Sequence, residues 1–345
     1  MPVNGSSSFV LSYKNHENST ALTNSSAAEW SVIPVCFIIS SVGGSLTNAA
    51  VLLAFVRDHR TLINPFTVHV IHLLLLNLIN SLTQYPVGVA ASLYTRWQPG
   101  PAICDLYLFG NSMFTAGTIN IHGLIALNRA WAIVHPLSYR TRNTKRFSLQ
   151  LCLGLWLFLW IVQFPNWLLN TILFRRPGEC TYNSDAMPAY NAFLDVAVFT
   201  LPVLLVIASF VVVSVYKFVL ARRHHSIRRN QVSVLRKQSQ TVQRGNSELD
   251  GPPSDVSIVK VTLQTRQRKY MVLALLTASV VIFCLPSTIF FGLVVWIPGF
   301  WGHDFYVVST VLVPVQLMLD PILFTLTLDK LQTAVGRVLR FKFQN

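Results

Sequence analysis

Long apolar stretches alternate with short polar segments along the whole chain. Five of the stretches contain no Asp, Glu, Lys or Arg; they are residues 30–56, 65–94, 106–128, 147–174 and 270–303. Two more stretches, residues 186–216 and 305–328, contain one acid each, Asp195 and Asp320. Since roughly 20 apolar residues of helix cross the core of a bilayer, the pattern predicts seven membrane-spanning helices. The expected fold class is an all-α membrane protein, a seven-transmembrane helix bundle.

The polar segments divide the chain into three parts. Residues 1–29 form a polar tail without an apolar run of signal-peptide type, so we expect the first span to direct insertion itself. Residues 30–328 form the seven-transmembrane domain, and the loop at 217–269 within it is polar enough to be partly disordered. Residues 329–345 contain a short amphipathic helix and the C-terminal tail.

The charges are few and mostly basic, and their positions predict the orientation in the membrane. Hydrophobic residues make up 52% of the chain and charged residues 12%, with a formal net charge of +14. The 27 Lys and Arg residues all fall on one side of the predicted spans except Lys14, Arg96, Arg175 and Arg176. By the positive-inside rule, the N-terminus is extracellular and the C-terminus is cytoplasmic. The basic residues therefore indicate contact with membrane lipid and give no support to a nucleic-acid partner.

The outer segments carry two further signals. Three glycosylation acceptor triplets, at Asn4, Asn18 and Asn24, crowd into the N-terminal tail. Of the five cysteines, only Cys104 and Cys180 lie at outer span ends or in outer loops, where a disulfide persists. We therefore predict a disulfide between Cys104 and Cys180 and expect the other three cysteines to be packed thiols.

Prolines and polar side chains occur inside the spans. The last four spans each have an interior proline, which removes a backbone hydrogen bond and bends the helix. Because an ionised carboxylate that faces lipid costs at least about 2.5 kcal/mol, we expect Asp320 to face inward, toward an amide or a cation. The other polar residues at this depth either surround such a pocket or only join helices through hydrogen bonds; they are Asn48, Asn77, Asn80, Thr118 and His122. His72 and His122 have no second ligand at metal spacing, so no metal site is predicted.

Each of the seven spans contains a short motif of fixed order: Asn48 with Val51, Leu73, Cys104, Trp156 before Pro165, Pro202, Pro286 and Pro321. Together these motifs resemble those of rhodopsin-like (class A) G protein-coupled receptors. Two motifs depart from the family pattern: Asn128-Arg129-Ala130 stands where the family has Asp-Arg-Tyr, and Asp320-Pro321-Ile322-Leu323-Phe324 stands where it has Asn-Pro-x-x-Tyr. The amphipathic stretch after the last span is similar to the family's eighth helix on the membrane surface.

The resemblance implies a plasma-membrane receptor that binds an extracellular ligand and signals to a heterotrimeric G protein, with arrestin as a further partner. Arg129 and Pro136 are then the G protein contacts. In the family, an acid before the arginine and an acid in span six commonly restrain it, and here Asn128 and Arg266 stand at those positions. We therefore hypothesise raised signalling without ligand.

Other departures leave an alternative open. Cys284 replaces the usual tryptophan of span six, and Phe210 and Phe324 replace tyrosines of spans five and seven. Those tyrosine hydroxyls help to hold the active state in the family. A non-signalling decoy or a chaperone-like receptor is thus the alternative function.

The family's polar core is a water-filled pocket that can hold sodium. The matching residues here are Asn48, Asn77, Thr118 and Asp320. The acid of span two has become Asn77 and the amide of span seven has become Asp320, so one carboxylate remains. Sodium near Asp320 stays an open expectation, and no other cofactor is predicted.

Helical spacing from the motifs gives the inward positions of the family's ligand cavity, which are Tyr107, Asn111, Thr115, Asp195, Ser287, Phe291 and Tyr306. Asn111 stands where amine receptors have an acid, and residues 305–328 contain no lysine for a retinal Schiff base. Asp195 could meet a cationic group, or it could be a solvated acid at a helix end. Residues 171–174 and 180–182 are β-prone and flank a Pro-Gly turn, which predicts a hairpin. Peptide receptors of the family often have such a hairpin, so a peptide is the favoured ligand.

Enzymes and transporters are the competing classes. Asp195 and Asp320 stand near opposite faces of the membrane, so the chain lacks a pair of acids at one depth, and it has no Gly-rich phosphate loop. The repeated halves typical of transporters are also missing. We therefore expect a receptor rather than an enzyme, and a transporter or channel is the weaker alternative.

Overall fold

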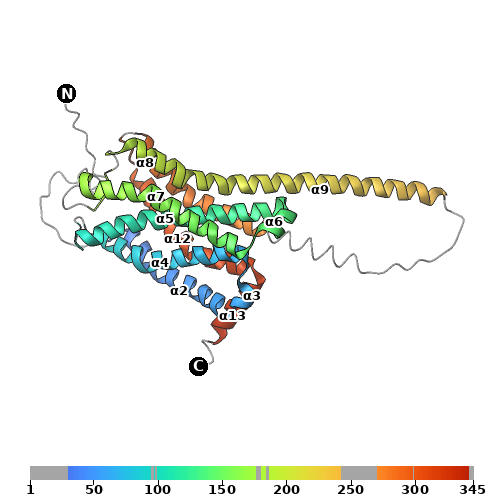
Figure 1. Cartoon of the computed structure of the whole chain (residues 1–345), viewed down its shortest axis with the longest axis horizontal. Helices are drawn as coiled ribbons and strands as arrows, with labels where there is room; N and C mark the ends of the chain where they lie inside the picture. The colour runs from blue at the N-terminus through green and yellow to red at the C-terminus, as the bar shows by residue number, and fades with distance from the viewer. Residues whose placement is uncertain are drawn as a thin grey trace.

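The computed structural model describes residues 30–94, 97, 99–175, 180–183, 186–241, 270–297 and 299–341, with the backbone alone for 223–241 and 341. These residues are almost entirely helical, and no strand occurs among them. Figure 1 shows the long helices lying side by side in one bundle. Four of the seven spans are single helices: α2 (Val32–Arg57), α4 (Pro65–Leu93), α5 (Pro101–Val134) and α12 (His303–Thr327). The fourth span consists of α7 (Lys145–Leu169) and η1 (Asn170–Phe174), and the fifth consists of α8 (Pro188–Leu194), η2 (Asp195–Thr200) and α9 (Leu201–Thr241). The sixth span, Tyr270–Trp296, includes η3 (Val280–Cys284) and α11 (Leu285–Trp296).

The predicted all-α bundle is confirmed. Each predicted span matches a helix within a few residues, apart from the extensions of α5 and α9 and from the sixth span, whose helix ends at Trp296 instead of residue 303. Three short helices flank the spans: α3 (His59–Leu62), α6 (Pro136–Arg142) and α13 (Asp329–Phe341), the last being the expected amphipathic helix. Six of the described spans are long and apolar enough to cross a membrane by composition alone. The exception is α5, which contacts α4, α7 and α9 and carries polar side chains on its buried face. A helix surrounded by other helices needs less apolar surface than one that faces lipid.

Three spans contain a π-helical turn close to their proline. η2 ends just before Pro202, η3 ends just before Pro286, and η1 follows Pro165 in the same span. Proline lacks the N–H that closes an α-helical turn, and a wider turn is one way in which a membrane helix pairs its freed carbonyls. Three of the four predicted proline sites thus lie near a wider turn, whereas α12 stays α-helical through Pro314 and Pro321.

The predicted hairpin is wrong for its first half. Residues Asn170–Phe174 form η1, the end of span four, and the N–H of Arg175 donates to the carbonyl of Asn170 at 2.7 Å. Continuing the helix pairs the backbone of these residues within the span, and this outweighs their β propensity. Residues 176–179, the predicted turn, lie outside the described residues.

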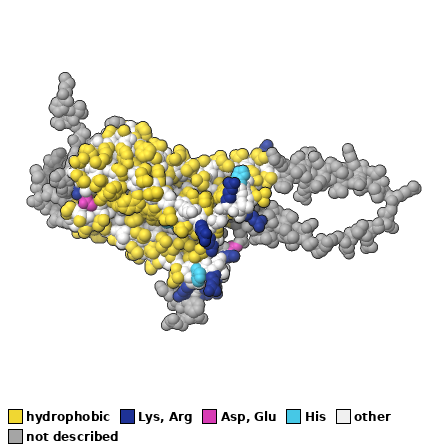
Figure 2. Space-filling view, in the orientation of Figure 1, with side chains coloured by type: hydrophobic (Ala, Val, Ile, Leu, Met, Phe, Trp, Pro, Cys, Tyr) yellow, Lys and Arg dark blue, Asp and Glu magenta, His cyan; other side chains and the backbone are white. Residues whose placement is uncertain are grey.

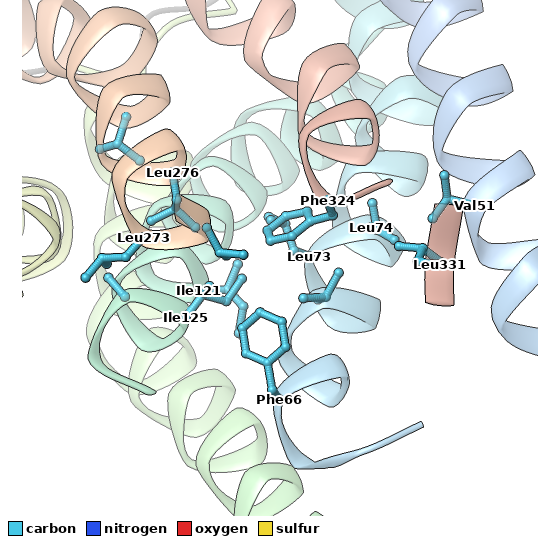
Figure 3. Packing of buried hydrophobic residues seen from close by; sticks show 14 of the residues in the cluster. Val51, Phe66, Leu73, Leu74, Ile121, Ile125, Leu273, Leu276, Phe324 and Leu331 are labelled. Carbon is cyan, nitrogen blue, oxygen red and sulfur yellow. The ribbon is translucent and has the colours of Figure 1, made fainter. Parts of the chain in front are cut away.

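One hydrophobic cluster joins all seven spans and α13 (Figure 3). Its members include Val51, Phe66, Leu73, Ile121, Cys152, Val206, Leu273, Phe324 and Leu331. Helices in a bilayer gain little hydrophobic free energy by associating, so close van der Waals packing supplies the stabilisation. Small residues allow that packing: a Cβ at position 44 would overlap with Ser81 and Leu317, so Gly44 lets α2, α4 and α12 approach closely.

The surface agrees with a membrane environment. Hydrophobic side chains cover most of the bundle in Figure 2, and the Lys and Arg residues gather at the end that carries α3, α6 and α13. Arg337 on α13 forms an ion pair with Asp58 at the end of α2, with 3.1 Å between Nη2 and Oδ2. This pair helps to hold α13 against the bundle, although exposed ion pairs contribute less than about 1 kcal/mol.

Candidate functional site

A cavity of about 300 Å³ lies at the end of the bundle that carries the Cys104–Cys180 disulfide, with Cys180 and Thr181 in its wall. Six of the seven predicted cavity residues line it, namely Tyr107, Asn111, Thr115, Ser287, Phe291 and Tyr306. Side chains of α2 and α4, including Phe37 and Tyr85, also line it, and these rings stack with 5.4 Å between centroids. Among the described lining residues there is no Asp, Glu, Lys, Arg or His. The cavity therefore offers hydroxyl, amide and aromatic groups without a formal charge.

Asp195, the seventh predicted residue, does not line this cavity. It lies in η2 with 7% of its surface exposed, and its Oδ2 accepts a hydrogen bond of 3.1 Å from Nε1 of Trp296 on the sixth span. The described residues of α8, η2 and α9 likewise do not reach the cavity. A buried acid needs a hydrogen-bond partner, and Trp296 supplies it here, so Asp195 is neither a solvated acid nor a cavity anchor.

The predicted disulfide between Cys104 and Cys180 is present, with 5.6 Å between the two Cα atoms. It places Cys180 and Thr181 against the cavity. Beside it, Arg175 pairs with Asp105, whose backbone carbonyl accepts a hydrogen bond of 3.1 Å from Nε1 of Trp167. These contacts join the first turn of α5 to the end of span four and hold Cys180 and Thr181 beside the cavity. The other three cysteines are free and wholly or partly buried.

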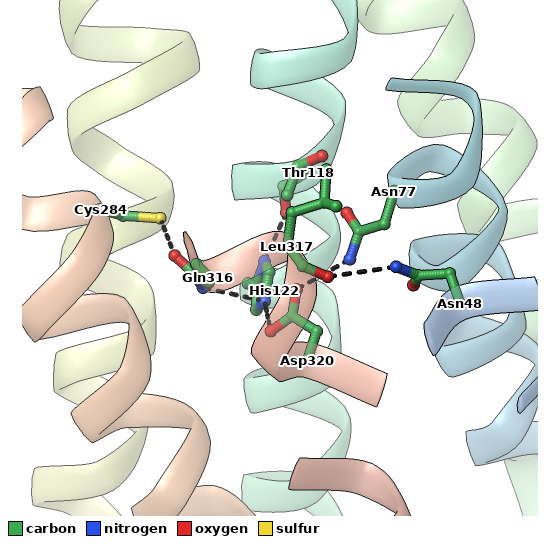
Figure 4. Close-up of polar contacts among 8 residues, drawn as sticks. All are labelled: Asn48, Asn77, Thr118, His122, Cys284, Gln316, Leu317 and Asp320. Carbon is green, nitrogen blue, oxygen red and sulfur yellow. Dashed lines mark hydrogen bonds and ion pairs between the residues drawn. The ribbon is translucent and has the colours of Figure 1, made fainter. Parts of the chain in front are cut away.

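A chain of polar contacts leads from the cavity into the bundle (Figure 4). It begins with Cys284 and Gln316, which both line the cavity. The Cys284 thiol donates to Oε1 of Gln316 at 2.6 Å, and Nε2 of Gln316 lies 3.2 Å from Nε2 of His122. That same nitrogen of His122 lies 3.2 Å from Oδ1 of Asp320. Three side chains, from span six, α12 and α5, thus connect the cavity lining to the buried carboxylate.

Asp320 faces the interior of the bundle and is 2% exposed. Its Oδ2 accepts a hydrogen bond of 2.9 Å from Nδ2 of Asn77, so the exchanged acid and amide of spans two and seven are in direct contact. Asn48 connects α2 to the same region of α12, because its Nδ2 donates to the carbonyls of Gly44 at 2.8 Å and Leu317 at 3.2 Å. The predicted polar group is therefore assembled from α2, α4, α5 and α12.

A sodium ion does not fit beside Asp320 in this arrangement. The His122 ring bridges the two groups that would flank the ion, since its Nδ1 lies 2.7 Å from the carbonyl of Thr118 and its Nε2 faces Asp320. Both carboxylate oxygens thus already face a protein nitrogen. The sequence analysis placed His122 at membrane depth but not beside Asp320. The contact between them exists only because α5 and α12 pack together, and the sequence of α5 alone does not show which helix His122 faces.

Arg129, at the opposite end of α5, is buried against an aromatic ring. It is 7% exposed, and its guanidinium carbon lies 2.9 Å from the centroid of Phe66. A capping box positions Phe66 at the start of α4, because Oδ1 of Asn64 accepts from the N–H groups of Phe66 and Thr67. No acid pairs with Arg129 among the described residues, and Arg266 lies outside them. The ring face of Phe66 therefore contacts the cation in place of a carboxylate.

The neighbouring residues of α5 and α6 have their own contacts. Oδ1 of Asn128 accepts a hydrogen bond of 3.0 Å from the hydroxyl of Tyr139 on α6. Burial raises the pKa of Tyr139, so this phenol stays a neutral donor. Pro136, the other predicted G protein contact, is the exposed first residue of α6.

The family model described as "7 transmembrane receptor (rhodopsin family)" matches residues 47–324, from the middle of α2 to near the end of α12. The chain belongs to the rhodopsin family of seven-transmembrane receptors. The matched region includes α5. In this rhodopsin-family receptor, α5 is therefore the span that the composition of the described helices does not identify. The family consists of receptors and not enzymes, which confirms that expectation.

Known relatives of this rhodopsin-family receptor are distant. The 5-hydroxytryptamine receptor 1B of Didelphis virginiana is 26% identical over 186 residues, which are 54% of this chain and 47% of that protein. Melanopsin of Mus musculus is 28% identical over 188 residues, which are 50% of this chain and 34% of that protein. The alignments therefore span less than half the length of these relatives.

The predicted glycosylation sites Asn4, Asn18 and Asn24 lie outside the described residues.

Proposed function

We propose that this rhodopsin-family receptor lies in the plasma membrane with its N-terminus outside, binds an extracellular ligand in the cavity and signals to a heterotrimeric G protein at the end that carries Arg129 and Pro136. The observation that carries the proposal is the polar chain from Cys284 and Gln316 to Asp320, because it starts at the cavity floor and ends among the packed spans. A ligand that contacts Gln316 changes the hydrogen bonding of that chain. Arrestin and membrane lipid are further proposed partners at the basic end.

The ligand, in this proposal, is uncharged where it enters the cavity. Burying an unpaired charge is costly, and the described lining residues supply no counter-charge. The name of one relative indicates 5-hydroxytryptamine, an amine, as that protein's ligand, but Asn111 and not an acid lines the cavity here. Residues 305–328 contain no lysine that could hold retinal as a Schiff base.

A peptide ligand remains part of the proposal only if the end that enters the cavity is uncharged. The first half of the hairpin that favoured a peptide is helix η1 instead of a strand, so the support for a peptide now comes from the cavity alone. A cavity of about 300 Å³ is at the small end of the range for ligand pockets. It accommodates a small neutral molecule or an uncharged end of a peptide.

Raised basal activity is also part of the proposal. Arg129 has no carboxylate partner among the described residues, and a desolvated cation–π contact contributes about 2 kcal/mol. A charge-assisted hydrogen bond to an acid would add a directional restraint. The resting state should therefore be held less firmly than in members that keep both acids.

Nucleotide exchange on purified heterotrimeric G protein tests the receptor function. The purified chain is reconstituted in lipid and screened with neutral small molecules and with peptides that differ only in a charged or blocked end. Thr115→Phe fills the cavity and should abolish the response, whereas Leu106→Phe, on the same helix but 70% exposed, should retain it. If the chain and its Arg129→Ala variant show equally low exchange with every ligand, the decoy or chaperone-like alternative is correct. A ligand with a buried charge that depends on Thr115 would overturn the proposed ligand class.

A further inference from the structure

We propose that His122 replaces the sodium ion in the polar core of this receptor, so that the partner of Asp320 is a side chain of the protein and the core does not bind sodium. The inference concerns the contacts of Asp320 and does not depend on the proposed ligand. It starts from the geometry of the His122 ring, which is 1% exposed and lies between α5 and α12.

The two ring nitrogens of His122 have different partners. Nδ1 lies 2.7 Å from the backbone carbonyl of Thr118. A carbonyl can only accept, so Nδ1 carries a hydrogen. Nε2 is then the atom that faces Asp320, at 3.2 Å from Oδ1. The helix itself thus fixes the ring orientation, because Thr118 lies one turn before His122 on the same helix.

One proton lies between His122 Nε2 and Asp320 Oδ1, since two bare acceptors at this distance would repel each other. If the proton is on His122, an imidazolium faces a carboxylate; if it is on Asp320, both groups are neutral. In either state the pair has no net charge. A sodium ion would therefore add a positive charge to a buried pair that is already neutral, and such a charge is costly.

The remaining ligands of Asp320 also come from the protein. Nδ2 of Asn77 donates to Oδ2 at 2.9 Å, so both carboxylate oxygens are engaged. Gln316 places its NH2 group beside Nε2 of His122 while its Oε1 accepts from the Cys284 thiol. A half turn of the amide would present the oxygen to a protonated Nε2 and the NH2 group to the Cys284 sulfur, which can also accept. The amide therefore tolerates both proton positions. It also joins the pair to Cys284 and the cavity, so a ligand can act on the partner of Asp320 directly instead of through an exchangeable ion.

Removing the imidazole should restore a sodium site. Three buried oxygens of the polar core have no hydrogen-bond partner in the described part of the chain: Asn48 Oδ1, Asn77 Oδ1 and Thr118 Oγ1. In His122→Ser, these oxygens, the new hydroxyl and an Asp320 carboxylate that keeps only its Asn77 partner form an oxygen-rich, negatively charged site of the kind that a hard cation prefers. The double variant His122→Ser/Asp320→Asn has the same space without the charge.

Thermal unfolding of the purified full chain in sodium chloride and in potassium chloride of equal concentration tests the inference. The wild type should unfold at the same midpoint in both salts. His122→Ser should gain a sodium-specific rise of about 3 °C, the size expected for an ion present at about ten times its dissociation constant. The double variant should lose that rise.

Two results would overturn the inference. A sodium-specific rise in the wild type equal to that of His122→Ser would mean that the ion binds beside His122. A folded His122→Ser without any sodium-specific rise would mean that His122 is not what excludes the ion. His122→Asn, which keeps a donor toward Asp320, is the second variant if the serine variant does not fold. Because the readout is stability, failure of G protein coupling leaves both outcomes unaffected.

Discussion

Replacing Phe66 with leucine should raise signalling without ligand. Leucine keeps an apolar side chain at the start of α4 but removes the aromatic face that contacts the Arg129 guanidinium. A cation–π contact contributes from about 0.5 kcal/mol when exposed to about 2 kcal/mol when desolvated. Arg129 is 7% exposed, so the upper half of that range applies. A loss of about 1–2 kcal/mol changes the ratio of released to held Arg129 by about 5- to 30-fold.

The assay is the rate of nucleotide exchange on purified G protein by the reconstituted chain without ligand. Phe66→Leu should raise this rate about fivefold or more, up to the rate of the fully active receptor. Phe55→Leu is the matched control, because Phe55 is a buried phenylalanine of the same core with no cation contact recorded in the described structure. Phe66→Trp retains an aromatic face and should keep the rate low. Arg129→Ala should abolish exchange in every background.

The reasoning would be refuted by equal basal rates in Phe66→Leu and Phe55→Leu. Equal rates would mean that the loss of packing, rather than the cation–π contact, determines the change. A basal rate in Phe66→Leu below that of the wild type would also refute it, since Phe66 would then be needed for coupling rather than for restraint. Unfolding midpoints of all variants, measured in parallel, show whether each variant is folded at the assay temperature.

Three further predictions concern stability. Cys104→Ser should lower the free energy of unfolding by about 2–5 kcal/mol, since the disulfide closes a loop between residues 76 positions apart; a reductant should destabilise the wild type and not the variant, and equal sensitivity would contradict this. Asn64→Ala should remove the cap of α4 at a cost of about 1 kcal/mol, and because it loosens Phe66 it should also raise basal exchange, by less than Phe66→Leu. Gly44→Ala should destabilise the bundle by about 1–3 kcal/mol because its methyl group would overlap with Ser81 and Leu317. Gly154→Ala, whose Cβ meets nothing within 4 Å, should be neutral or stabilising. Similar unfolding midpoints for these two glycine variants would contradict the packing argument.

The sequence alone determined the spans and the family. A span depends on the length of an apolar stretch and the charges at its ends, which are local properties, so the seven stretches matched seven helices and even the polar α5 was included. The pairing of Cys104 with Cys180 followed from the same orientation, because it left only two cysteines on the outer side. The prolines likewise indicated where three spans deviate from α-helical geometry.

The predicted hairpin is a case in which the local β propensity of the sequence did not determine the structure. Residues 171–174 are β-prone, yet they complete the helix of span four. Their backbone groups are paired within the span, as the membrane requires, and β propensity is small compared with the cost of unpaired groups in that environment. The peptide preference drawn from the hairpin lost its support for this reason.

Only the tertiary structure decided which polar groups meet. His122 and Asp320 are separated by 198 residues, Arg129 and Phe66 lie on different helices, and Asp195 faces Trp296 instead of the cavity. Each contact depends on the rotation and depth of two helices, which follow from the close packing of their side chains and are not specified by the pattern of either helix alone. The sequence therefore identified Asp320, His122 and Arg129 but not Gln316. The packing of the helices determined that the partner of Asp320 is a histidine and the partner of Arg129 is an aromatic ring.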